Sequence, residues 1–297
     1  MKDYYIFYNN NFVRQSKAVL SVLSASTQFG LNVFEGIRIY KEDAYYVFRL
    51  EEHLRRLNNS LNQLGFQTRT ITAKEFIDIV KELIILNEIK TDFSIRFTYL
   101  VNEIDSWSSN SRPVFFIAPL IRERNSPDYF KTTIVTKTRR ISSLAMDTKV
   151  KCGANYINGR YALLEAKAKG ADLPILKNKD GFISESTGAC VFLVKNGVVM
   201  TPSLDSDILE SITRDTVIKI LLENNYKIEE RHITEKDFYE SDEVFLCGTS
   251  AEITPIKRLE SKDFKIGDLT KFISEEYTYA TRAKSYKNYG WTTKIEI

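Results

Sequence analysis

Two ionisable side chains lie in sequence surroundings that suit chemistry. Lys151 begins the run Lys-Cys-Gly-Ala-Asn-Tyr, between a polar stretch and an expected helix start. The small residues at positions 153 and 154 would let a flat ligand approach the backbone there. Glu185 follows an expected strand, in the run Gly-Phe-Ile-Ser-Glu-Ser-Thr-Gly. Taken singly, a lysine or a glutamate is far more often a surface or ion-pair residue, so both become catalytic candidates only through the anion-binding features elsewhere in the chain.

Three other places offer hydrogen-bond donors to an anion. Residues 211–215 (Ser-Ile-Thr-Arg-Asp) begin an expected helix with two hydroxyl groups at its N-terminus. Free N–H groups and the positive dipole end make a helix start a phosphate site, although an ordinary cap explains the same residues. Residues 248–251 (Gly-Thr-Ser-Ala) form a second donor-rich turn, after a strand. Arg56, on the helix behind His53, would supply a bidentate clamp, unless it simply faces solvent.

The elements that must position these residues come in an irregular order. Turn signals at residues 9–11, 41–43, 179–181 and 196–197 predict four hairpins, and Asn196-Gly197 is the strongest of these signals. Expected strands cover residues 4–7, 12–13, 37–40, 45–50, 93–100, 114–117, 132–136 and 243–247, and expected helices cover 54–64, 72–84, 158–169 and 215–225. Because strands and helices do not alternate regularly, we expect an α+β fold in two domains rather than a doubly wound sheet.

A polar stretch divides the chain. Residues 119–128 (PLIRERNSPD) are rich in charge and have a proline near each end, which is typical of a linker. We therefore expect a smaller α+β domain over residues 1–118, an interdomain linker over 119–128, and a larger α+β domain over 129–297 that carries Lys151.

Composition excludes several classes of protein. The 297 residues include 42 Lys and Arg against 39 Asp and Glu, and this interleaved balance is not the footprint of a nucleic-acid-binding protein. The run 137–140 (KTRR) is expected as a solvated strand end. No apolar run approaches the roughly 20 residues that span a bilayer. Three cysteines and two histidines suit neither a disulfide framework nor a zinc site. We expect a cytoplasmic protein with no metal, membrane or nucleic-acid partner.

Six runs carry a resemblance to a known family. In chain order they are residues 34–38 (FEGIR), 52–57 (EHLRRL), 151–156 (KCGANY), 183–185 (ISE), 212–215 (ITRD) and 248–255 (GTSAEITP). Together they resemble the class IV aminotransferases, which are the fold-type IV pyridoxal-phosphate enzymes with the fold of D-amino-acid aminotransferase. The branched-chain amino-acid aminotransferases are the nearest branch. The resemblance extends over about residues 4–260.

The resemblance implies pyridoxal 5'-phosphate as cofactor and a role for each candidate. Lys151 would hold the cofactor aldehyde as a Schiff base and then move the proton between Cα and C4′. Glu185 would pair with the pyridine nitrogen and keep it protonated. Tyr156 would donate a hydrogen bond to the 3-hydroxyl group. The phosphate would be held by Arg56, Ile212, Thr213 and Thr249.

The resemblance also implies a substrate side. Phe34, Arg38 and Arg96 would line it, so that an apolar wall and an arginine could accept either an aliphatic side chain or the second carboxylate of glutamate. The backbone N–H groups of Ser250 and Ala251 would meet the substrate's α-carboxylate. The small-molecule partners are therefore an amino acid and a 2-oxo acid. Family members are commonly homodimers, so we expect a homodimer here.

The chain also departs from the family pattern. Cys190 stands where the family usually has asparagine, and Ser211 stands where it has glycine. Phe29 and Ser94 replace tyrosines that are usual in the branched-chain branch, and the run 119–121 lacks an aromatic residue. The cofactor set is thus nearly intact, while the substrate set is altered.

We therefore predict an aminotransferase that moves an amino group between an L-amino acid, with branched-chain substrates first, and a 2-oxo acid such as 2-oxoglutarate. The run 34–38 favours this branch over a D-amino-acid transaminase or an aminodeoxychorismate lyase of the same fold, whereas the altered substrate set leaves an amine transaminase open as an alternative. A further alternative is a non-catalytic member that kept the fold. Cys190 motivates this alternative, and the presence of both Lys151 and Glu185 counts against it.

Overall fold

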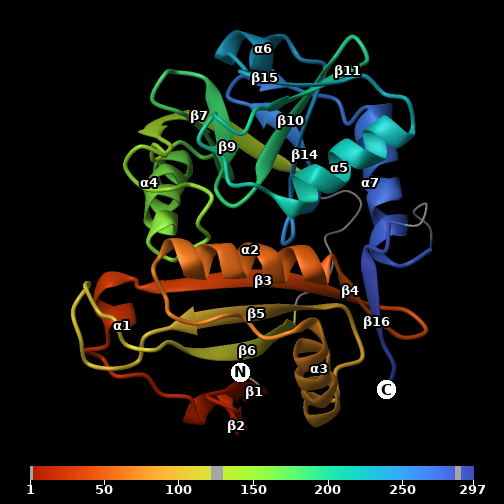
Figure 1. The fold of residues 1–297 in the computed structure, drawn as a ribbon. Helices are drawn as coiled ribbons and strands as arrows, with labels where there is room; N and C mark the ends of the chain where they lie inside the picture. The colour runs from red at the N-terminus through yellow and green to blue at the C-terminus, as the bar shows by residue number, and fades with distance from the viewer. Residues whose placement is uncertain (1–2, 122–129, 285–288) are drawn as a thin grey trace. The chain divides into compact units, whose positions relative to one another are not determined.

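The computed structural model describes residues 3–121, 130–284 and 289–297 (Figure 1). Contacts between Cα atoms divide the chain into two compact units, which are described one at a time. Unit 1 holds Met1–Arg124, Val150–Ala154 and Tyr279–Ile297, and unit 2 holds Asn125–Lys149 and Asn155–Thr278.

Unit 1 is built on an antiparallel sheet of seven strands, in the order β16-β4-β3-β5-β6-β1-β2. The strands are β1 (Tyr5–Tyr8), β2 (Asn11–Arg14), β3 (Asn32–Lys41), β4 (Tyr45–Phe48), β5 (Phe93–Leu100), β6 (Val114–Ile121) and β16 (Thr292–Ile295). The predicted hairpins β1–β2 and β3–β4 are confirmed. The central pair β3–β5 aligns Gly36 with Arg96 and Arg38 with Ser94, and this register later places the substrate-side candidates.

The helices of unit 1 are α1 (Ala25–Phe29), α2 (Leu50–Gln63) and α3 (Ala73–Asn87), with a short 3-10 helix η1 (Gln15–Lys17). The predicted capping box at the start of α3 is confirmed: Thr72 and Glu75 exchange side-chain-to-backbone hydrogen bonds. Leu54, Leu57 and Leu61 of α2 are buried against the apolar side chains of the sheet. This packing fixes α2 along β3, which matters because α2 also carries Arg56.

Two features of unit 1 differ from the predicted domain division. Residues 119–121, expected as part of a linker, continue β6, and Pro119 lies opposite Ile95 of β5; the remainder, 122–128, lies outside the described residues. The segment with Lys151 packs in unit 1 and not in a domain that starts at 129, because Val33 and Cys152 form a β-bridge. The C-terminal strand β16 likewise pairs with β4. Such long-range pairing leaves no local signal in the sequence.

Unit 2 contains a mixed sheet of nine strands in the order β12-β11-β10-β13-β14-β7-β8-β9, with β15 paired to β14. The strands are β7 (Lys131–Arg139), β8 (Leu173–Lys177), β9 (Ile183–Ser186), β10 (Cys190–Lys195), β11 (Val198–Pro202), β12 (Ile228–Arg231), β13 (Glu243–Gly248), β14 (Glu252–Leu259) and β15 (Lys262–Asp263). The β14–β7, β7–β8 and β11–β12 pairs are parallel, and the others are antiparallel. The predicted α+β class is confirmed.

The helices of unit 2 are α4 (Asn155–Ala168), α5 (Ile212–Glu223) and α6 (Glu235–Glu240), and α7 (Asp268–Thr281) runs on into unit 1. Both α4 and α5 begin three residues before their predicted starts at 158 and 215. For α5 the reason is local, because the side chain of Ser211 caps the helix by accepting a hydrogen bond from the Arg214 N–H. The earlier start places Ile212 and Thr213 in the first turn of α5.

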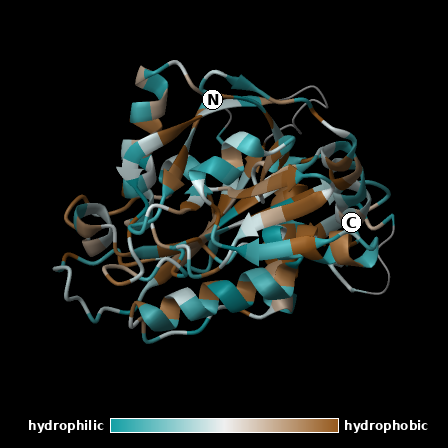
Figure 2. Ribbon diagram, turned by 90° about the horizontal axis from the view of Figure 1, so that it is seen from above, coloured by the Kyte–Doolittle hydropathy of each residue, from teal (hydrophilic) through white to brown (hydrophobic). Residues whose placement is uncertain are grey.

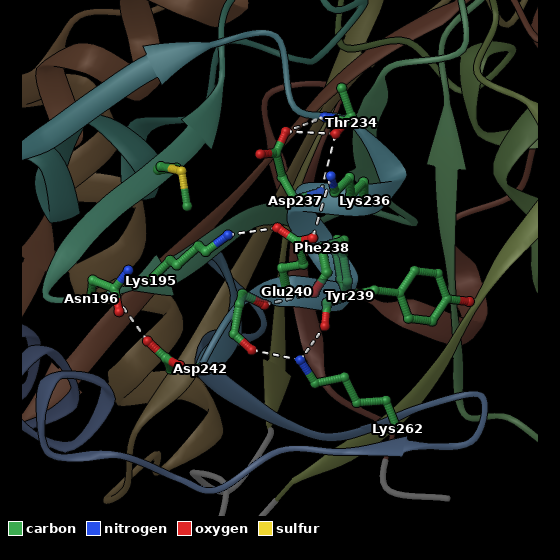
Figure 3. A network of polar contacts seen from close by, with 12 residues as sticks. Lys195, Asn196, Thr234, Lys236, Asp237, Phe238, Tyr239, Glu240, Asp242 and Lys262 are labelled. Carbon is green, nitrogen blue, oxygen red and sulfur yellow. Dashed lines mark hydrogen bonds and ion pairs between the residues drawn. The ribbon is translucent and has the colours of Figure 1, made fainter.

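Hydrophobic residues concentrate on the strands, whereas the helices carry both hydrophobic and hydrophilic residues (Figure 2). A network of polar contacts surrounds α6 in unit 2 (Figure 3). Thr234 and Asp237 form a capping box at the start of this helix. At its end, Lys262 donates hydrogen bonds to the carbonyl oxygens of Tyr239 and Ser241, which a helix C-terminus otherwise leaves without partners. Among the described residues, no helix is both long and apolar enough to cross a membrane.

Candidate active site

The backbone around Lys151 runs along the first part of β3. The Phe34 N–H donates to the Lys151 carbonyl oxygen at 3.0 Å, and the Lys151 N–H donates to Ser60 Oγ at 3.1 Å. Paired positions on adjacent strands direct their side chains to the same face. Lys151 and Phe34 therefore share a face, and Lys151 Nζ lies 5.0 Å from the centre of the Phe34 ring.

The predicted substrate-side residues of unit 1 lie on this same face. Strand alternation places Phe34, Gly36 and Arg38 on one face of β3, and Arg96 lies opposite Gly36 on β5. The Arg96 guanidinium is 4.4 Å from the centre of the Phe34 ring. A Cβ atom built on Gly36 would meet no heavy atom within 4 Å. Unit 1 thus brings Lys151 and the three predicted substrate residues to one face of its sheet, with open space beside Gly36.

Arg56 of α2 belongs to a buried ionic cluster around Glu35 of β3, which the sequence did not predict. Glu35 is fully buried, and its two carboxylate oxygens accept hydrogen bonds from Arg56 Nε at 2.7 Å and Nη2 at 2.8 Å. His53 Nδ1 lies 2.8 Å from the same carboxylate. Burial pushes the pKa of Glu35 upward, but Arg56 and His53 together outweigh it and hold that pKa well below its usual range. Burial lowers the pKa of His53, which Glu35 opposes.

Unit 2 holds Glu185 at the end of β9. This carboxylate is buried, accepts a hydrogen bond from the Leu209 N–H at 3.1 Å, and lies 2.8 Å from Arg140 Nε. The run 137–140 was expected as a solvated strand end, but the Arg140 side chain is only 9% exposed. The prediction for this run was wrong at Arg140, because its charge is matched by a carboxylate 45 positions away in the chain. The Arg140 guanidinium thus helps to hold the Glu185 carboxylate in place where little solvent reaches it.

The start of α5 follows Leu209 and presents backbone donors. Ile212 and Thr213 are the first two residues of α5 and are buried. The first N–H groups of a helix have no partner inside the helix and point along its positive dipole end. Arg214 does not add its charge there, because its Nη2 donates to the Pro202 carbonyl and to Glu230, each at 2.8 Å. The helix start therefore offers main-chain donors, which suits a phosphate group.

The turn with Thr249, Ser250 and Ala251 lies at the same end of the unit 2 sheet. It follows Gly248, where an added Cβ would lie 3.0 Å from the carbonyl oxygen of Gly188. A side chain at this position would crowd that oxygen, so glycine suits the close approach of β13 to the turn that follows Glu185. Unit 2 thus gathers the Glu185 carboxylate, the start of α5 and this turn at one end of its sheet.

Tyr156 belongs to the first turn of α4 and is 36% exposed. One turn later, a Cβ on Gly159 would come within 2.9 Å of the Thr187 side chain. The start of α4 therefore packs closely against the loop directly after Glu185. This places the phenol of Tyr156 on an element that adjoins the carboxylate.

Cys190 occupies a structural position in unit 2. It lies opposite Cys247 in the β10–β13 pair, and both side chains are buried. The Cys190 thiol donates a weak hydrogen bond to the Leu209 carbonyl, with the two atoms 4.0 Å apart. Burial, helped by the neighbouring Cys190, raises the pKa of the Cys247 thiol. Cys190 thus supports the residue whose N–H holds Glu185.

The structure adds four residues to the candidates: Glu35, His53, Ser60 and Arg140. One signal could have found part of this set, since His53, Arg56 and Ser60 have the i, i+3, i+7 spacing of one helix face. No local pattern links Arg140 to Glu185. Among the described residues, no group of three or more His, Cys, Asp or Glu side chains could hold a metal ion.

Comparison with known proteins gives the family of this chain. A family model described as amino-transferase class IV matches residues 32–259. A protein of Aquifex aeolicus named as a probable branched-chain-amino-acid aminotransferase is 32% identical, over 98% of this chain and 96% of its own length.

Solved structures agree with the sequence relatives. The branched-chain aminotransferase of Thermoproteus uzoniensis, solved with norvaline, has a TM-score of 0.93 at 33% identity and covers 99% of both chains. The branched-chain amino acid aminotransferase of Thermobaculum terrenum, solved in its pyridoxal-phosphate holo form, has a TM-score of 0.91 at 30% identity, over 99% of this chain and 98% of its own.

Proposed function

Because the chain belongs to the class IV aminotransferase family, we propose that it is a branched-chain amino-acid aminotransferase. It moves the amino group between an L-amino acid and a 2-oxo acid such as 2-oxoglutarate. The family and the fold class predicted from the six runs are confirmed by the match over residues 32–259 and by the likeness to solved structures. The D-amino-acid, amine, lyase and non-catalytic alternatives are not favoured, since the relatives described above carry branched-chain aminotransferase names.

One observation carries this proposal: an amine, an aromatic ring and an arginine share one face of the unit 1 sheet. Lys151 Nζ and the Arg96 guanidinium both lie over the Phe34 ring, and Gly36 leaves space beside them. An amine in this place can react with a carbonyl group or transfer a proton. The apolar ring suits an aliphatic side chain, and the arginine suits a carboxylate.

Pyridoxal 5'-phosphate is the cofactor, and the residues present fit it chemically. A nucleophilic amine is available for its aldehyde at Lys151, and a buried carboxylate is available for its ring nitrogen at Glu185. Backbone N–H groups at the start of α5 suit its phosphate. When bound, the cofactor supplies a protonated ring that draws electrons from the substrate's Cα.

We propose a separate role toward the cofactor for each candidate residue. Lys151 Nζ would hold the cofactor aldehyde and, once the substrate's amino group has displaced it from that carbon, would be able to move the proton between substrate Cα and C4′. The Glu185 carboxylate, which is held by the Leu209 N–H and by Arg140, would accept a hydrogen bond from the protonated ring nitrogen. Tyr156 donates to the 3-hydroxyl group. The phosphate is held by Arg56, by the N–H groups of Ile212 and Thr213, and by Thr249.

The roles of the substrate-side residues are proposed from the family resemblance. Phe34 provides the apolar contact, while Arg38 and Arg96 bind the second carboxylate of glutamate or 2-oxoglutarate. The N–H groups of Ser250 and Ala251 meet the α-carboxylate. Since Phe29 lacks the hydroxyl group that the family's tyrosine would bring, we expect aliphatic donors to be favoured over hydroxylated ones.

A donor panel tests the proposed function. The pure protein with cofactor should be yellow, and its visible absorbance should fall on addition of L-leucine, L-valine or L-glutamate. It should return on addition of 2-oxoglutarate, because the amino group is then passed on. D-alanine, a chiral amine and aminodeoxychorismate serve as controls and should leave the spectrum unchanged. A response only to one of these three controls would contradict the branched-chain assignment while keeping the cofactor.

We also propose that the enzyme is a homodimer. Several apolar side chains of unit 1 are exposed along the stretches before α1 and after β5: Val19, Leu20, Val22, Leu23, Ile104 and Trp107. Exposed apolar side chains that gather in one region are typical of protein–protein contacts. Light scattering after size exclusion should give twice the chain mass of 34.3 kDa; a mass of one chain would contradict the proposal.

The cytoplasm is the proposed location. Cys152, Cys190 and Cys247 are buried, and none of them forms a disulfide bond among the described residues. Cys190 and Cys247 remain thiols although they lie opposite each other on neighbouring strands. Free thiols in such a pair fit a reducing compartment.

A further inference from the structure

The Glu35 cluster of unit 1 has a more specific arrangement than burial alone requires. A fully buried carboxylate is costly unless charged or polar partners surround it. Glu35 has two such partners, and both belong to α2: Arg56 at 2.7 and 2.8 Å, and His53 at 2.8 Å. Because Glu35 is held ionised, it accepts from both, so His53 Nδ1 carries the hydrogen of that bond.

The bidentate contact fixes the plane of the Arg56 guanidinium. An unconstrained arginine side chain samples many rotamers. With Nε and one Nη group bound to Glu35, the orientation of the whole planar group is determined by β3. The side chain of Arg56 is 13% exposed, so the group is not a freely moving surface cation.

The same face of α2 also holds the lysine segment. Ser60 lies one turn after Arg56, and its hydroxyl oxygen accepts a hydrogen bond from the Lys151 N–H. Glu35 is the direct neighbour of Phe34, whose N–H donates to the Lys151 carbonyl. The Glu35–Arg56 pair and the backbone of Lys151 therefore belong to one rigid frame made by β3 and α2.

We propose that Glu35 is the positioning residue that orients Arg56 toward the cofactor phosphate, with His53 as the second partner that keeps Glu35 in place. This inference rests on the proposed function, which assigns Arg56 to the phosphate. Glu35 itself touches neither cofactor nor substrate in this arrangement. Its contribution passes through the guanidinium of Arg56.

Simple electrostatics predicts the opposite sign for a change at Glu35. If the carboxylate only neutralised Arg56, then Glu35→Gln would leave an uncompensated positive charge and tighten the binding of a phosphate dianion. If Glu35 positions Arg56, the same change weakens that binding because the guanidinium loses its orientation. The direction of the change therefore distinguishes positioning from neutralisation.

The test compares the dissociation constants of pyridoxal phosphate and pyridoxal, measured by titration of the apoenzyme. Glu35→Gln should raise the constant for pyridoxal phosphate about 10-fold to 100-fold, the loss expected for one charge-assisted hydrogen bond. The constant for pyridoxal, which has no phosphate, should stay within about twofold. The phosphorus NMR shift of the bound cofactor should also move, because the phosphate has lost an oriented donor.

Glu52→Gln is the matched control. Glu52 lies on the same helix and also binds an arginine, with Arg49 Nε donating to it at 2.6 Å. The Glu52→Gln change should leave the ratio of the dissociation constant of pyridoxal to that of pyridoxal phosphate unchanged. A double-mutant cycle adds Arg56→Gln, and the combination with Glu35→Gln should lower the ratio no further than Arg56→Gln alone.

Arg56→Lys covers the case in which Glu35→Gln does not fold. Lysine keeps the charge but cannot make the bidentate contact, so the ratio should fall by a similar factor, and an unchanged ratio would overturn the proposal. Tighter phosphate binding in Glu35→Gln, or additive effects of Glu35 and Arg56, would also overturn it. Failure of the proposed function looks different, since the wild-type protein would then bind neither compound, or both equally well.

Discussion

Lys151→Ala is expected to reduce transamination by a factor of about 10⁴ or more, since proton transfer by a positioned side chain alone is worth about 10²–10⁴. The variant loses both the covalent bond to the cofactor and the base at Cα. The structure also predicts that the fold survives, because the segment is held by main-chain bonds to Phe34 and Ser60 rather than by the amine. The rate is measured with L-leucine and 2-oxoglutarate, and the loss of yellow colour is followed in the visible spectrum.

Lys149→Ala provides the control for this experiment. Lys149 is an exposed lysine two residues earlier in the chain, so its removal should leave rate and colour within about twofold, as is usual for surface changes. Turnover by Lys151→Ala within tenfold of the wild-type rate would show that another group carries the proton.

Glu185→Gln is expected to lower turnover about 10²–10³-fold, the usual effect of removing one electrostatic partner of a transition state. Glutamine has the same shape but no charge, so it cannot keep the pyridine nitrogen protonated. Its amide oxygen can still accept the Leu209 N–H, which preserves the local backbone. The turnover number and the visible spectrum of the cofactor-loaded variant are the measurements.

Two further measurements separate chemistry from stability at this site. The change at Glu185 also leaves Arg140 without its carboxylate, so the thermal midpoint is recorded beside the rate. Glu165→Gln is the control, because that carboxylate accepts hydrogen bonds from the Lys137 and Thr138 N–H groups and has a purely structural place. It should lower the midpoint and leave turnover intact. An unaltered rate in Glu185→Gln would mean that the ring nitrogen has a different partner.

Cys190 shows how a departure from a family pattern can be absorbed locally. Its thiol reaches the Leu209 carbonyl, and the N–H of the same residue donates to Glu185. The position therefore supports the Glu185 carboxylate through the main chain. The side chain that stands there need only fill the space opposite Cys247 and contact one carbonyl.

Features with local causes could be predicted from the sequence. The Asn196-Gly197 turn, where both residues have positive φ, and the capping box of Thr72 and Glu75 each depend on residues within one turn. The helix over residues 50–63 follows from its leucine spacing. The six family runs contain every candidate of the proposed site except Arg96.

Features that depend on distant pairing could not be predicted in this way. The assignment of Lys151 to unit 1 depends on a bridge between Val33 and Cys152, and β16 joins β4 across more than 240 positions. Arg140 was expected in solvent and instead faces Glu185.

The sequence by itself determined the turns, the capping box of α3, the family and the residue types proposed for the site, because these depend on short runs of side chains. Only the tertiary structure decided which carboxylate each cation meets: Glu35 for Arg56, and Glu185 for Arg140. The physical reason is that a buried charge is stable only beside its partner, and the partner's position depends on strand register and helix packing. Those are properties of the folded chain as a whole.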